Sequence, residues 1–125
     1  MRAALDFPGR IKHLVLAATS GGLDTSRLGV VDWRPAWRKE HPSEPWWADD
    51  RSNFEDRLAE INAPTLLLWG EADPISPVVV GRYLKTLLPH AELVLVPDGN
   101  HAFARERVDE IVPHIERHLL ETRES

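Results

Sequence analysis

Three short apolar runs mark the chain, at residues 13–17 (HLVLA), 65–69 (TLLLW) and 92–96 (ELVLV). None of them alternates apolar with polar positions, so we predict strands that are buried on both faces, as parallel strands between two layers of helices are. The run at 13–17 has the composition of an interior strand. We therefore expect a neighbouring strand beside it, supplied by a segment upstream of Met1.

Patterns with a helical period lie between and after these runs. The first predicts a helix over residues 53–60, with Ser52 and Glu55 forming an S-x-x-E capping box at its start. The second predicts a helix over residues 77–88, with Ser76 as its N-cap and proline at the first helical position, where the missing N–H costs nothing.

The third pattern predicts one helix over residues 105–120, kinked at Pro113. Its apolar stripe consists of Val108, Ile111, Val112, Ile115 and Leu119. Strands and helices therefore alternate along the chain, which predicts an α/β fold of parallel strands with flanking helices, joined by right-handed crossovers.

The segment 21–51 interrupts this alternation with a different composition. It contains four of the five tryptophans and three prolines, and it shows no sustained period. We expect one domain over residues 1–125, within which 21–51 is an excursion from the sheet.

Composition narrows the function classes. The net charge of −5 argues against nucleic acid or an anionic membrane as a partner, because both select basic surfaces. The absence of cysteine excludes disulfides and thiolate chemistry. No apolar run approaches the roughly 18 residues of a membrane span, and the N-terminus lacks the apolar core of a secretory signal, so we expect a cytoplasmic protein.

Candidate catalytic groups follow two of the apolar runs. Asp73 comes shortly after the run 65–69, and His101 comes shortly after the run 92–96. Ligands bind at the carboxyl ends of parallel strands, so both side chains are expected at the same end of the sheet. A histidine held by a carboxylate can act as general base and then as general acid. Either residue alone is also typical of an ordinary turn, but the pair favours catalysis, with Glu71 a distant second choice for the acid.

Three segments are similar to the C-terminal half of an α/β-hydrolase, and the resemblance extends from Pro8 to Leu120. They are PGRIKHLVLAATSGG, INAPTLLLWGEADPISP and LPHAELVLVPDGNH. The resemblance implies that Asp73 is the acid and His101 the base of a catalytic triad. It further implies acyl hydrolysis of an ester-like small molecule, with no cofactor and no metal.

The nucleophile of this family lies in a G-x-S-x-G elbow, a motif that the sequence lacks. The resemblance implies that a serine before Met1 supplies it. Ser20, in the A-x-S-x-G at 18–22, is the candidate nucleophile inside the chain. An elbow must turn directly into a helix, whereas GLDTSRLGVVDW follows Ser20, so we favour a polar loop there.

The excursion lies where this family inserts its cap. Its tryptophans either line an apolar substrate pocket or anchor a short lid, and both interpretations remain open: Trp33, Trp37, Trp46 and Trp47. His114 and His118 are spaced as a candidate metal pair on a helix, but without a third ligand we favour a solvated helix face and predict no metal site.

The alternative function is non-catalytic. A fragment or interaction module that retains Asp73 and His101 would have an unpaired sheet edge, and it would self-associate through that edge.

Overall fold

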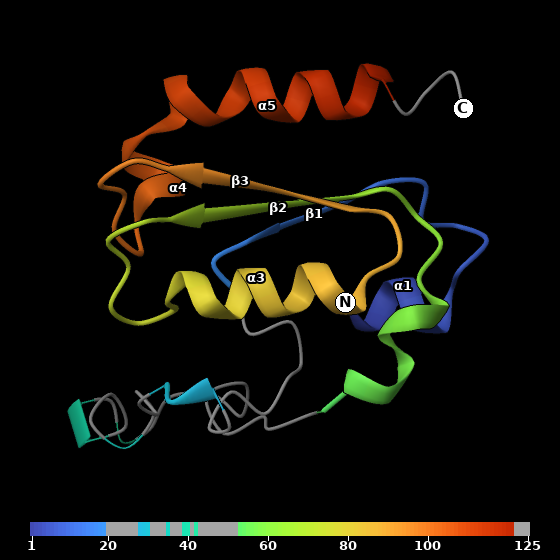
Figure 1. Cartoon of the computed structure of the whole chain (residues 1–125), viewed down its shortest axis with the longest axis horizontal. Helices are drawn as coiled ribbons and strands as arrows, with labels where there is room; N and C mark the ends of the chain where they lie inside the picture. Colours follow the sequence, from blue (N-terminus) through green and yellow to red (C-terminus); the bar gives the residue numbers. More distant parts are fainter. Residues whose placement is uncertain (20–27, 31–34, 36–38, 41, 43–52, 122–125) are drawn as a thin grey trace.

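The computed structural model has a parallel three-stranded sheet at its centre, with the strand order β1-β2-β3 (Figure 1). The strands are β1 (Leu14–Ala17), β2 (Thr65–Gly70) and β3 (Ala91–Val96). The structure describes residues 1–19, 28–30, 35, 39–40, 42 and 53–121. Each strand lies within one residue of its predicted run, and the parallel α/β class is confirmed.

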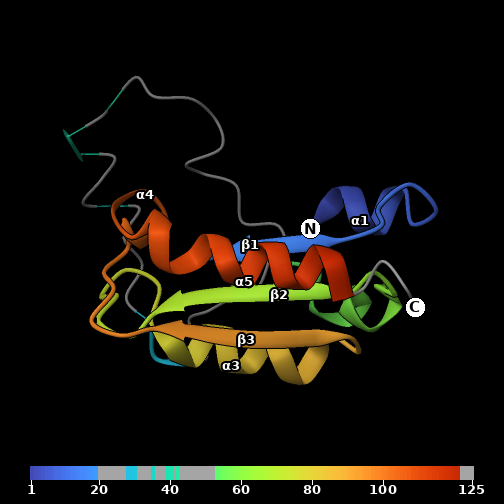
Figure 2. The same cartoon turned by 90° about the horizontal axis from the view of Figure 1, so that it is seen from above.

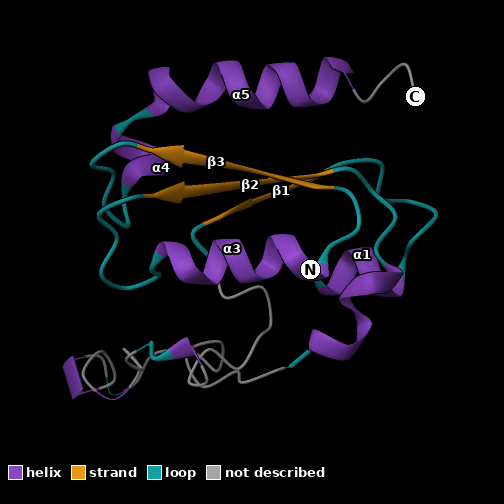
Figure 3. Cartoon of the chain, viewed as in Figure 1, coloured by secondary structure: helices purple, strands orange, loops and turns teal. Residues whose placement is uncertain are grey.

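Helices cover both faces of the sheet (Figures 1 and 3). One face carries α3 (Val78–Leu87), together with α1 (Arg2–Asp6) and the 3₁₀-helix η3 (Glu55–Glu60). The other face carries α5 (Val108–Glu121), which follows the short helix α4 (Phe103–Glu106).

The central strand β2 explains why its apolar run does not alternate. Leu67 and Trp69 pack in the core on the α3 face, and Leu66 and Leu68 pack in the core on the α5 face. Every residue of β2 is buried, so both faces of this strand select apolar side chains.

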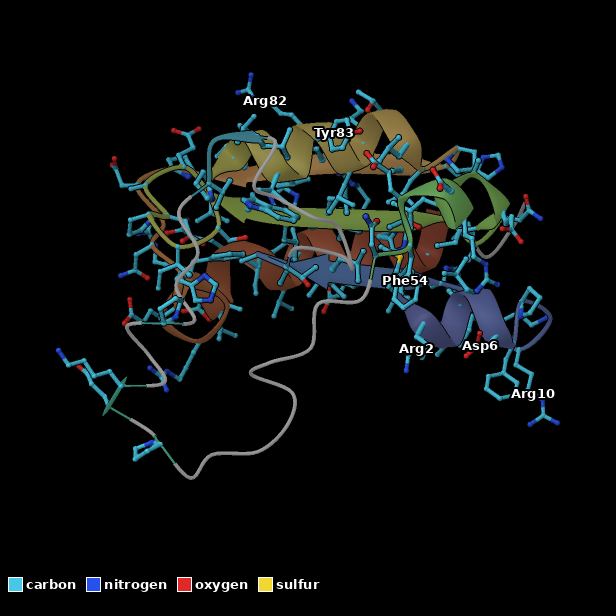
Figure 4. The ribbon with its side chains drawn as sticks, turned by 90° about the horizontal axis from the view of Figure 1, so that it is seen from below. Arg2, Asp6, Arg10, Phe54, Arg82 and Tyr83 are labelled. Atoms are coloured by element: carbon cyan, nitrogen blue, oxygen red, sulfur yellow. The ribbon has the colours of Figure 1, made fainter. Side chains whose placement is uncertain are left out.

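Two contacts connect η3 and Phe54, the residue before it, to the other helices on this face of the sheet. The Arg2 guanidinium lies over the ring of Phe54, at 5.3 Å from its centroid (Figure 4). The hydroxyl of Tyr83 on α3 donates to the carboxylate of Glu55. The helix predicted over residues 53–60 is thus confirmed, as a 3₁₀-helix.

The starts of two helices differ from the sequence prediction. Helix α3 begins at Val78 with Pro77 as its N-cap residue, and no side chain caps it. Ser76 is therefore not the N-cap residue, and its backbone N–H donates instead to Asp73 Oδ1. In front of η3, Asn53 Oδ1 accepts the N–H of Glu55 at 3.0 Å, whereas the predicted capping residue Ser52 lies outside the described residues.

The helix predicted over 105–120 is two helices, because the backbone leaves helical geometry at Arg107 (φ −121°, ψ 38°). Pro113 lies inside α5 as predicted. Only part of the predicted apolar stripe reaches the core. Ile111 is buried, whereas the exposed members of the stripe are Val108, Val112 and Leu119.

The buried face of α5 includes a histidine. His118 is only 5% exposed and packs edge-on against His13 next to β1, with ring centroids 5.6 Å apart. The prediction of a solvated helix face at His118 is therefore wrong. Its imidazole occupies a position that an apolar side chain would otherwise fill, and a hydrophobic pattern cannot signal such a position.

Strand β1 lies at one edge of the sheet (Figure 2). Within the described part of the chain it pairs with β2 alone, and its Val15 and Ala17 are exposed. The neighbour that we expected beside this strand is thus not among the described residues. No helix in the described segments is both long and apolar enough to cross a membrane.

Candidate active site

Asp73 and His101 meet beyond the carboxyl ends of β2 and β3. His101 Nδ1 lies 2.9 Å from Asp73 Oδ2. The side chain of Asp73 is fully buried, whereas that of His101 is 45% exposed. The carboxylate is therefore shielded from water while the imidazole remains accessible to a reactant, which is the arrangement that an acid–base histidine needs.

The second oxygen of Asp73 is fixed by its own loop. Asp73 Oδ1 accepts the backbone N–H of Ile75 at 2.8 Å and that of Ser76 at 2.9 Å. These bonds are the local turn contacts expected of an Asp before a proline, and Oδ2 is left for His101. The turn and catalytic interpretations of Asp73 are thus compatible, because each uses a different carboxylate oxygen.

Backbone contacts hold the two loops against each other. Gly70 ends β2 so close to the β3 loop that a β-carbon on it would lie 2.3 Å from the carbonyl oxygen of Gly99. The N–H groups of Glu71 and Ala72 donate to the carbonyls of Val96 and Gly99, at 3.0 and 2.9 Å. Sequence reasoning missed both glycines as positioning residues, although each directly follows an apolar run or its turn.

The loop that carries His101 is anchored on its far side. Asn100 Oδ1 accepts the N–H of Ala102 at 2.8 Å. Phe103, the first residue of α4, is fully buried in the core on the α5 face. His101 therefore lies between two fixed points, one at Gly99 and one at Phe103.

The other predicted site residues are not part of this pair. Glu71 is exposed, and Asp73 rather than Glu71 contacts His101. Ser20 and the four tryptophans of the excursion lie outside the described residues. Among the residues that the structure describes, His114 and His118 do not belong to any group of three or more side chains that could hold a metal ion.

Comparisons with known proteins agree with the fold. The family model of the alpha/beta hydrolase fold matches residues 43–107, just over half of the chain. An uncharacterized hydrolase of Bacillus subtilis (strain 168), YugF, is 37% identical over 60 residues, which are 48% of this chain and 22% of that protein. A poly(3-hydroxyalkanoate) depolymerase of Ectopseudomonas oleovorans is 36% identical over 67 residues, which are 54% of this chain and 23% of that protein.

Solved structures share the fold over nearly the whole chain. An α/β hydrolase from the metagenome of lagoon sediments of Mar Chica, Morocco, superposes with a TM-score of 0.72 at 24% identity, covering 96% of this chain and 55% of that one. A thermophilic esterase from Thermogutta terrifontis gives a TM-score of 0.73 at 20% identity, covering 95% and 59%. The chain spans about a quarter or less of the length of YugF and of the depolymerase. The family match, together with this sheet, shows that the chain belongs to the α/β-hydrolase fold family.

Proposed function

We propose that this chain supplies the acid and the base of a serine-type hydrolase that acts on ester-like small molecules. His101 takes the proton of a serine hydroxyl while the serine oxygen bonds to the acyl carbon, and it then returns that proton to the departing alcohol. Water then attacks the acyl carbon of the acyl-serine, with His101 again taking and returning the proton, and the carboxylic acid is released. Asp73 fixes the His101 tautomer and stabilises the imidazolium that forms.

The observation that carries the proposal is the 2.9 Å contact between a fully buried carboxylate and a half-exposed imidazole at the carboxyl ends of adjacent strands. The relatives are consistent with it, since their names include a depolymerase, a lipase and an esterase. The sequence has no G-x-S-x-G. We therefore assign the nucleophile to a serine upstream of Met1, and the proposal involves no cofactor or metal.

The test is to join this chain to the G-x-S-x-G-bearing segment of an α/β-hydrolase relative and to measure hydrolysis of p-nitrophenyl acetate. Asp73→Asn leaves the geometry in place but no longer favours the required tautomer, so kcat should fall by up to about 10⁴-fold. His101→Ala should have an effect of at least similar size.

The matched control is His90→Ala, an exposed histidine just before β3 and so at the opposite end of the sheet. This variant should keep the activity of the unmodified fusion. Activity that survives His101→Ala in a folded fusion would contradict the proposal.

A second candidate function is a non-catalytic interaction module, favoured by the edge of the sheet at β1. Val15 is 36% exposed on this strand, which pairs with β2 alone in the described part of the chain. Unpaired edge strands promote association. This candidate predicts concentration-dependent self-association in light scattering after size exclusion, reduced by Val15→Lys, whereas a monodisperse monomer at all concentrations would contradict it.

The excursion 21–51 belongs to the proposal as a cap. In the fusion, Trp46→Ala and Trp47→Ala should change the preference among acyl chain lengths if these rings line the pocket. If these substitutions lower only the thermal stability, Trp46 and Trp47 are lid anchors. The third candidate, a small hydrolase that uses Ser20, is the least favoured of the three.

A further inference from the structure

The loop that carries Asp73 is held at its far end by the side chain of Trp69. Trp69 is the last side chain of β2, and it is fully buried. Its indole Nε1–H donates to the backbone carbonyl of Ser76 at 2.9 Å. The indole thus joins the end of the strand to the end of the loop.

Ser76 connects this bond to the candidate active site. The carbonyl of Ser76 accepts from Trp69, and its own N–H donates to Asp73 Oδ1 at 2.9 Å. The other carboxylate oxygen of Asp73 contacts His101 Nδ1. A continuous series of hydrogen-bonded groups therefore runs from the indole through Ser76 and Asp73 to the imidazole.

The indole itself is confined by α3. A β-carbon on Gly81 would lie 2.8 Å from Cδ2 and 2.9 Å from Cε3 of Trp69, so the helix backbone presses directly on the ring. The buried carbonyl of Ser76 also depends on this donor, because an unsatisfied buried carbonyl is costly. The ring is thus fixed from the helix side, and its N–H is aimed at the loop.

We propose that Trp69 is a positioning residue for the Asp73–His101 pair. Its indole N–H fixes Ser76, and Ser76 in turn fixes the direction in which the Asp73 carboxylate faces. The inference rests on the proposed function for its catalytic meaning, but its structural content can be measured in this chain alone. Without the indole N–H, the bond from Ile75 to Asp73 Oδ1 remains, but Asp73 should hold a much smaller share of His101 in the form that carries its proton on Nδ1.

The experiment is NMR of the purified chain with ¹⁵N-labelled histidine, at a pH well above the range in which imidazoles are protonated. Ring-nitrogen shifts then report the tautomer, and loss of one signal set in His101→Asn assigns His101. Asp73→Asn, which no longer favours a proton on Nδ1, gives the reference for the loss of this tautomer. Trp69→Phe fills the same space without the N–H, and it should shift the His101 tautomer signal at least halfway toward that reference.

The matched control is Leu67→Val, which alters a fully buried side chain on the same face of β2 that makes no hydrogen bond to the loop. It should lower the melting temperature and leave the His101 tautomer unchanged. Gly81→Ala is the second variant, because it displaces the indole from the helix side while its N–H is retained. It should move the His101 signal in the same direction as Trp69→Phe, and it replaces that variant if Trp69→Phe does not fold.

The outcomes separate the two claims. If Asp73→Asn leaves the His101 tautomer unchanged, the acid–base pair and the proposed function fail. If Asp73→Asn changes it while folded Trp69→Phe or Gly81→Ala does not, the role of Trp69 fails and the proposed function stands. Equal shifts in Leu67→Val and Trp69→Phe would reduce Trp69 to an ordinary core residue and would overturn the inference.

Discussion

Gly70 and Gly99 bring the loops of Asp73 and His101 into backbone contact. Gly70→Ala would place a methyl group 2.3 Å from the Gly99 carbonyl oxygen, and the two loops would have to separate. Overpacking of this kind costs about 1–3 kcal/mol, and here it should also lengthen the contact between Asp73 and His101. Urea unfolding measures the first effect, and histidine NMR measures the second.

The control for this substitution is Gly9→Ala, where an added β-carbon meets no atom within 4 Å. Its effect on the free energy of unfolding should stay within about 0.5 kcal/mol. If Gly70→Ala were no less stable than Gly9→Ala, the close approach of the two loops would not exist in solution.

The residue scale also shows why the site could be predicted only in part. Asp73 and His101 come shortly after apolar runs, so the carboxyl-end rule for parallel strands and the family resemblance were enough to name them. The bond from Trp69 to Ser76 depends on how the loop folds back over its own strand. That geometry leaves no trace in hydrophobic periodicity.

Helix α5 contacts the sheet through a narrow face. Ile111 is 6% exposed and packs with the α5-side residues of β2, whereas its neighbour Val112 is 39% exposed. Ile111→Ala should therefore lower the free energy of unfolding by about 2–4 kcal/mol, because it leaves a cavity against the sheet. Val112→Ala on the same helix should change it by less than about 0.5 kcal/mol.

Urea unfolding of both variants checks this prediction, and their different exposure makes them a matched pair. If Ile111→Ala and Val112→Ala lowered the free energy of unfolding equally, α5 would be rotated about its axis in solution. In the orientation of α5 described above, Arg117 on this helix forms an ion pair with Glu92 on β3 at 2.8 Å.

At the scale of elements, the strands were predictable because each is an uninterrupted apolar run. The helices were less predictable. The break at Arg107 and the start of α3 depend on backbone geometry that the pattern does not encode. His118 was misjudged because its burial depends on His13, which comes from the other end of the chain and meets it only in the folded protein.

The whole molecule combines the contact between Asp73 and His101 with a sheet that has β1 at one edge. The solved relatives superpose on nearly all of this chain, although it covers only 55% and 59% of the two described above. The part of the fold that this chain carries includes the strand ends at which Asp73 and His101 lie 2.9 Å apart. We propose that another segment of polypeptide supplies the nucleophile.

The most direct test of that account is intact-mass analysis of the purified, folded chain after treatment with a fluorophosphonate. We expect no stoichiometric adduct, because Asp73 and His101 alone offer no activated serine. A full adduct that maps to Ser20 and disappears in His101→Ala would contradict it. That result would make the chain a complete serine hydrolase.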